Sequence, residues 1–141
     1  MLKISKMADY AVVVVISIDD LHKKNFKNVT SEEVSNQTGL SMSTVNQIIK
    51  ALSRNNVVIS KRGVGGGVIL SGELGDISLL EVIQSVDGEV ELTDCAKRKS
   101  ECCSIVSICP VSENWRIVNN KIVDLLGQIK IKDMISNGCN G

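Results

Sequence analysis

Aromatic residues and histidine are scarce in this 141-residue chain, and each shortage restricts what the protein can be. Phenylalanine, tryptophan and tyrosine occur once each, so any hydrophobic core must be aliphatic. His22 is the single histidine, and the chain offers neither a nucleophile motif nor a recognisable pair of catalytic carboxylates. We therefore predict that the protein is not an enzyme.

Long apolar runs and an export signal are also missing. The longest apolar stretch, residues 11–18, is interrupted by Ser17 and is far shorter than the ~20 residues that a membrane span requires. We find no signal peptide in the sequence. These observations predict a cytoplasmic protein without a membrane-spanning segment, whose cysteines lie in a reducing compartment.

Acidic residues are absent from the middle of the chain, although the formal net charge is zero. Residues 34–72 contain four basic side chains (Lys50, Arg54, Lys61 and Arg62) and no acidic one, which leaves 12 basic against 16 acidic residues elsewhere. The charge is therefore +4 inside this stretch and −4 outside it. A local basic face of this kind indicates a polyanionic partner.

The same basic stretch has the pattern of a helix-turn-helix. Thr30 and Glu33 form a capping box that opens a helix to about Thr38, and Gly39 ends it. Ser41 can cap a second helix with one apolar stripe. Its other face is polar and basic, and it carries the residues that we predict to contact DNA: Ser41, Ser43, Thr44, Asn46, Gln47 and Lys50.

Two short β-branched runs follow, at residues 57–59 and 68–70, and they predict a hairpin with a basic, glycine-rich tip. Directly after a helix-turn-helix such a hairpin is typical of a wing. Lys61, Arg62 and Gly65 are its predicted DNA contacts, because glycine permits close approach to the backbone and arginine can enter the minor groove. The glycines lack the Gly-Lys-Ser/Thr ending of a phosphate-binding loop.

Four of the five cysteines, Cys95, Cys102, Cys103 and Cys109, fall within fifteen residues. Thiolates gathered in this way suit iron-sulfur clusters or zinc. A buried packing role is disfavoured by the charged residues between them, and disulfides are disfavoured by the reducing compartment. Pro110 at the first position of a helix would place Cys109 at the N-cap, where the helix dipole favours a thiolate.

After Pro110 the apolar residues recur every four and three positions, which predicts a heptad seam: Val111, Trp115, Val118, Ile122, Leu125 and Ile129. Such a helix is too long for a small domain to bury alone, so we expect a homodimer. The predicted fold is mainly α with a small β-hairpin. It comprises a winged helix-turn-helix (residues 1–86), a cysteine-rich loop (87–109) and a dimerisation helix with its tail (110–141).

The order of these motifs resembles a known family. The sequence Lys-Ile-Ser-Lys-Met-Ala-Asp-Tyr-Ala begins at Lys3, Lys-Arg-Gly-Val-Gly-Gly-Gly forms the wing, and Leu-Thr-Asp-Cys leads into the cysteines. This arrangement is similar to the bacterial winged-helix regulators that include the iron-sulfur regulator IscR, the nitric-oxide sensor NsrR and the regulators of SUF operons. The resemblance implies a homodimeric transcription factor whose operator binding depends on an iron-sulfur cluster, [2Fe-2S] or [4Fe-4S].

The same resemblance implies a set of cluster ligands. Cys95, Cys103 and Cys109 match the family's three cysteines, with Cys102 as the alternative to Cys103. In IscR-like members a histidine lies three residues after the last cysteine, where this chain has Ser112. In NsrR-like members an aspartate of the partner's first helix completes the site, and the matching residue here is Asp9. Cys102, Glu113 and His22 are the other candidates for the fourth ligand.

Three functions follow for testing. The leading one is a repressor or activator controlled by an iron-sulfur cluster, which would regulate cluster-assembly or stress genes. The second keeps the DNA-binding part but uses thiols or zinc as the redox sensor. The third is an interaction module for an enzyme of cysteine metabolism or cluster assembly. Metal analysis and duplex binding distinguish these three functions.

Overall fold

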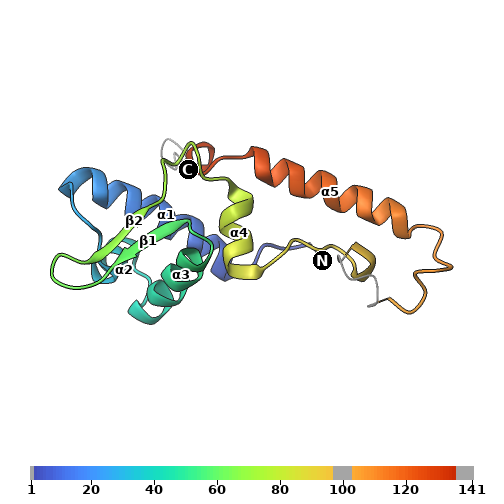
Figure 1. Cartoon of the computed structure of the whole chain (residues 1–141), viewed down its shortest axis with the longest axis horizontal. Helices are drawn as coiled ribbons and strands as arrows, with labels where there is room; N and C mark the ends of the chain where they lie inside the picture. The colour runs from blue at the N-terminus through green and yellow to red at the C-terminus, as the bar shows by residue number, and fades with distance from the viewer. Residues whose placement is uncertain (1, 97–102, 136–141) are drawn as a thin grey trace.

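The computed structural model describes residues 2–96 and 103–135. In Figure 1, α1 to α3 and the hairpin lie together at one end, α4 lies beside them, and α5 extends away from this group. The elements in chain order are α1 (Lys6–Asn25), α2 (Ser31–Thr38), α3 (Met42–Arg54), β1 (Val58–Lys61), β2 (Gly67–Leu70), α4 (Leu79–Asp87), the short 3-10 helix η1 (Asp94–Ala96), α5 (Ser112–Gln128) and the 3-10 helix η3 (Ile131–Met134).

Local hydrogen bonds set the boundaries of the central helices. Thr30 caps α2, and Glu33 reaches back to the Thr30 backbone in a complete capping box. Ser78 and Glu81 form the same box at α4, and Gly39 ends α2 with a φ of 77°. Ser41 caps α3 by accepting from the Thr44 backbone. The predicted helix-turn-helix is therefore confirmed at its caps.

The core is aliphatic, as the composition predicts. The helices α1, α2 and α3 contribute inward side chains, and the hairpin, α4 with the segment before it, and η3 complete the cluster. Its largest fully buried members are Ile18, Ile48, Leu52, Ile131, Val14, Val15, Val29, Val34, Val45, Val58 and Val82. Because Ile131 follows α5, the far end of that helix is held against the domain.

The hairpin is antiparallel, with Val58 opposite Leu70 and Ser60 opposite Val68. Val29, which precedes α2, adds an isolated bridge to Val68. Its N–H donates to the Val68 carbonyl at 2.9 Å, and the Val68 N–H donates back at 2.7 Å. The wing is thereby attached to the helix-turn-helix at its base.

One helix boundary differs from the prediction. α5 begins at Ser112 with Val111 as its N-cap, so Pro110 is not at the first helical position and Cys109 is not the cap. The Cys109 carbonyl accepts from the Ser112 hydroxyl at 3.4 Å, while Trp115 donates the first helical bond to Val111 at 3.0 Å. The prediction that Cys109 is the N-cap of this helix is therefore wrong.

At its other end α5 returns to the domain through main-chain bonds. Leu79 donates to the Ile129 carbonyl at 2.8 Å, and Ile131 donates to Ile77 at 2.9 Å. Within the described residues, no helix combines the length and apolar character needed to cross a bilayer. The predicted fold, mainly α with a small hairpin and a long final helix, is confirmed, while the division at residues 86 and 109 stays a prediction.

Candidate nucleic-acid interface and cysteine site

The free face of α3 is polar and open. Ser41 and Ser43 are exposed at its start, and Asn46, Gln47 and Lys50 are exposed along it. The Ser41 hydroxyl donates to Thr44 Oγ1 at 2.9 Å, which leaves Thr44 half-buried beside the cap. These are the donors and acceptors that read base edges and phosphates when a helix enters a major groove.

A groove of about 530 Å³ separates α3 from β1. Three cationic side chains line it, Lys50 and Arg54 from the helix and Arg62 from the wing. The hydroxyl residues Ser53 and Ser60 lie between them. A groove lined by cations and hydroxyls suits a phosphate backbone. Arg54, Ser53 and Ser60 were not among the predicted DNA contacts, although Arg54 belonged to the basic stretch.

The cations of this face are not neutralised by neighbours. In residues 2–96 and 103–135, the ion pairs join Lys23 to Asp19, Lys24 to Asp20 and Lys27 to Glu33, all on α1 or around the start of α2. Lys50 and the wing residues Lys61 and Arg62 take part in none of these pairs, and all are exposed. Their charge is therefore available to a polyanion.

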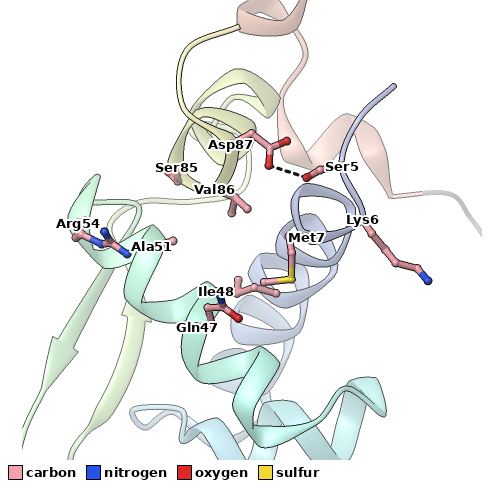
Figure 2. Close-up of a pocket in the computed structure, with 10 residues that line it drawn as sticks. All are labelled: Ser5, Lys6, Met7, Gln47, Ile48, Ala51, Arg54, Ser85, Val86 and Asp87. Atoms are coloured by element: carbon pink, nitrogen blue, oxygen red, sulfur yellow. Dashed lines mark hydrogen bonds between the residues drawn. The ribbon is translucent and has the colours of Figure 1, made fainter. Parts of the chain in front are cut away.

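Behind α3 a cavity of about 380 Å³ lies among the start of α1, the middle of α3 and the end of α4 (Figure 2). At its edge the Ser5 hydroxyl donates to Asp87 Oδ1 at 2.6 Å. Ser5 also caps α1 by accepting from the Ala8 backbone. Since Asp87 ends α4 and Ile48 of α3 lines the same cavity, the helix that leads to the cysteines contacts the recognition helix.

Cys95 is the best-defined of the predicted ligands. It lies in η1 with 7% of its surface exposed, and its Sγ is 3.0 Å from the Thr93 hydroxyl. The Arg116 guanidinium of α5 donates from Nε to the Cys95 carbonyl at 2.9 Å. The helix α5 thus holds the backbone of Cys95, although Arg116 lies 21 residues later in the chain.

Asn119 fixes the residues that precede Cys95. Its amide is buried on α5, with Oδ1 accepting from the Leu92 backbone at 2.9 Å and Nδ2 donating to the Val90 carbonyl at 3.0 Å. Arg116 and Asn119 lie three residues apart, on one face of the helix. Neither was predicted, because their partners are 21 to 29 residues away in the sequence.

Among the residues that the structure describes, the predicted ligands are not gathered into one site. Cys103 and Cys109 are half-buried free thiols, and Cys102 lies outside the described residues. Asp9 is exposed in the first turn of α1, beside an apolar pocket of about 310 Å³ lined also by Leu126. Among residues 2–96 and 103–135, no three His, Cys, Asp or Glu side chains come together as a metal site.

A family profile described as an iron-dependent transcriptional regulator, Rrf2, matches residues 4–137, a range that includes the wing and the cysteine segment. The chain belongs to the Rrf2 family. A relative in Xenorhabdus nematophila, the HTH-type transcriptional regulator IscR, is 30% identical over 136 residues, or 96% of this chain and 80% of that protein. IscR of Pectobacterium atrosepticum is 29% identical over the same shares.

Solved structures show the same fold as this Rrf2 chain. CymR, the global cysteine regulator of B. subtilis, has a TM-score of 0.68 at 21% identity, over 95% of this chain and 96% of that one. IscR of T. potens has a TM-score of 0.63 at 23% identity, over 97% and 94%. The predictions of a DNA-binding transcriptional regulator, of the family and of a non-enzyme are confirmed by these relatives.

Proposed function

We propose that this Rrf2-family chain is a cytoplasmic, homodimeric regulator whose operator affinity depends on an iron-sulfur cluster bound by Cys95, Cys103, Cys109 and Asp9. The observation that carries the proposal is the placement of Cys95. Its backbone is held by α5 on one side, and the segment before it continues from α4, which contacts α3. A cluster bound at Cys95 would therefore lie on the connection between the recognition helix and the long helix.

The chemistry of these donors fits the cofactor. Cys95, Cys103 and Cys109 are free thiols, and soft sulfur ligands select iron-sulfur centres. When bound, a [2Fe-2S] or [4Fe-4S] cluster supplies iron-thiolate ligation that responds to oxidation. The family description, iron-dependent transcriptional regulator, and the IscR names of the relatives support the same choice.

Asp9 is proposed to act from the partner subunit. Within one chain, Cys95 contacts Arg116, whereas the pocket beside Asp9 is lined by Leu126. Ten helical residues separate these two contacts, which is about 15 Å along α5. That separation supports a ligand set completed by a second copy of the chain.

The exposed seam of α5 supports the dimer. Trp115 is 42% exposed and Leu125 is 57% exposed, and Val118 and the N-cap residue Val111 are exposed as well. Apolar side chains at heptad spacing on an extended helix are typical of a helix that pairs with another. A second copy would cover them and bring two recognition helices to one duplex, as a two-fold operator requires.

On loss of the cluster, the residues of this chain are proposed to act as follows. Arg116 and Asn119 keep residues 90–95 on α5, while Cys103 and Cys109 separate from Cys95. The link that the partner's Asp9 would make to these cysteines is then lost, and with it the fixed spacing of the two α3 helices. Because half-site spacing is geometric, such a change alters the grip on the operator.

Anaerobic reconstitution with iron and sulfide tests the ligand set. We expect visible absorbance and acid-labile sulfide in the native chain, and loss of both in Cys95→Ser. Cys139→Ser, which changes a cysteine outside the proposed set, is the matched control and should keep them. A colourless native protein under these conditions would overturn the proposal.

The second candidate is a thiol- or zinc-based regulator on the same scaffold. It is favoured by the partial accessibility of Cys103 and Cys109, because a reactive thiol must be reachable. Zinc with no iron in anaerobically purified protein would support it. An interaction module for a cysteine-metabolism enzyme would instead show no salt-dependent duplex binding that weakens on changing Lys50 and Arg62.

A further inference from the structure

We propose that Asn28 is a positioning residue for the wing, which holds the glycine-rich tip in the conformation that grips DNA. This inference rests on the wing contact proposed above. The Asn28 side-chain amide donates from Nδ2 to the Gly65 carbonyl at 3.0 Å, across 37 residues of sequence. Asn28 itself lies in the segment between α1 and α2, apart from the recognition helix.

The wing tip has little structure of its own. Gly63 and Gly65 have φ angles of 96° and 74°, and a side chain at either position would point into open space. The turn is closed by the Gly66 N–H, which donates to the Gly63 carbonyl at 2.9 Å. Glycine-rich turns of this kind have a large conformational freedom. The Asn28 amide links this turn to the body of the domain.

The base of the wing is held by the neighbour of Asn28. Val29 pairs with Val68 through two backbone bonds, and a Cβ added to Gly67 would lie only 2.5 Å from the Val29 carbonyl oxygen. Glycine at this position is what allows the close approach. Residues 28 and 29 therefore hold both the tip and the base of the wing, directly before the Thr30 cap of α2.

This attachment orders the cations of the wing before DNA arrives. Lys61 ends β1, and Arg62 follows it immediately before Gly63. A tip that is already ordered loses less conformational entropy on binding than a free one. Asn28 thus raises operator affinity through Arg62 without needing to touch DNA.

A double-mutant cycle measures this coupling. We expect Asn28→Ala and Asn28→Leu, which remove the donor without adding a charge, each to weaken duplex binding by roughly threefold to tenfold. In an Arg62→Ala background the same changes should have less than a twofold effect. In a Lys50→Ala background, which removes a cation of α3, the full effect should persist.

The outcomes separate the two levels of the proposal. If Arg62→Ala weakens binding and the Asn28 variants do not, the role of Asn28 is overturned and the wing contact stands. If Arg62→Ala has no effect, the wing contact itself is wrong. An undiminished Asn28 effect in the Arg62→Ala background would show general damage to the fold and would also overturn the role of Asn28.

Amide hydrogen exchange provides a second measurement that is independent of DNA. We expect faster exchange at residues 63–66 in Asn28→Leu, with unchanged exchange in the buried part of α1. Equal exchange at the tip in the native chain and in Asn28→Leu would overturn the proposal, because the amide would then not be ordering the wing.

Discussion

At the scale of single residues, the polar side chains that hold segments together are those with distant partners. Asn28, Arg116 and Asn119 each bond to main-chain atoms 21 to 37 residues away. Such partners cannot be inferred from spacing, because the pattern of a sequence reports only neighbours along the chain. Their function in the fold becomes visible only when the distant segment is in place.

Asn119→Ala should destabilise the protein by about 2 to 3 kcal/mol. The change leaves the Leu92 N–H and the Val90 carbonyl without their partner beneath α5, and an unpaired buried polar group costs about 1 to 3 kcal/mol. Urea unfolding measures the difference. Asn120→Ala, at the exposed neighbouring position, is the control and should change little. Equal effects of the two substitutions would contradict the buried role of Asn119.

Glu33 links folding stability to pH. The Thr30 backbone N–H donates to Glu33 Oε2 at 2.8 Å, and this bond is the main reason that the pKa of Glu33 lies below its ordinary value of 4.5. A side-chain bond from Lys27 lowers the pKa further. A lowered folded pKa contributes stability that is present above about pH 4.5 and is lost as pH falls through the folded pKa.

Glu33→Gln removes this titration and therefore tests it. We expect the native chain to exceed Glu33→Gln in unfolding free energy at pH 7, and the difference to shrink as the pH falls from 4.5 toward 3. Urea denaturation at several pH values follows the difference. A difference that stays constant over this range would refute the link between the capping box and acid stability.

At the scale of elements, the sequence predicted the start of each helix that is capped by a residue close to it in the chain. Thr30 with Glu33 and Ser78 with Glu81 form bonds three residues apart, so the starts of α2 and α4 were readable from the sequence. The start of α5 was not, because Pro110 fits a first helical position whereas α5 begins two residues later, at Ser112, with Val111 as its N-cap. Proline alone does not decide which carbonyl begins a helix.

In the candidate site, too, some features could be predicted from local sequence and others could not. The polar face of α3 and the basic wing followed from the absence of acidic residues and from helical spacing. The groove between them, with Arg54 and Ser60, required the angle between α3 and β1, which depends on the packing of the whole domain. The placement of Cys95 also depends on a contact beyond local sequence, the bond from Arg116.

Lys50→Ala should weaken duplex binding and reduce its salt dependence. Lys50 lines the groove between α3 and β1 and forms none of the ion pairs among the described residues. Each phosphate contact contributes about 0.9 to the slope of log K against log salt, so we expect the slope to fall by about 1. Titrations at several salt concentrations measure it.

Lys23→Ala is the matched control for this titration, because Lys23 is a lysine of α1 that pairs with Asp19 at 2.9 Å. It should leave the slope unchanged. If log K falls equally steeply with log salt for the native chain and for Lys50→Ala, then Lys50 does not contact a phosphate of the duplex.

At the scale of the whole molecule, two copies are proposed to share each cluster site. Mixing Cys95→Ser with Asp9→Ala chains tests this sharing. In a mixed dimer one of the two sites would receive a native cysteine set from one subunit and a native Asp9 from the other. Random exchange of an equal mixture makes about half of the dimers mixed, so about a quarter of the native cluster content should return. Each variant alone should load poorly.

Recovery in the mixed sample, measured as iron and acid-labile sulfide after subunit exchange, is the predicted outcome. If Asp9 acted within its own chain, every site of the mixed dimer would lack a ligand, and mixing would restore nothing. Asp19→Ala is the control, because it also removes one negative charge from α1, where Asp19 pairs with Lys23. This variant alone should load its cluster normally.

Operator affinity with and without the cluster tests the central claim most directly. A duplex selected from a random library with the anaerobic native protein would be titrated with the cluster-loaded form and with the same protein after chelation of its iron. We predict dissociation constants that differ by at least about tenfold, which corresponds to about 1.4 kcal/mol. Equal constants for the two forms, with the cluster content verified, would contradict the account.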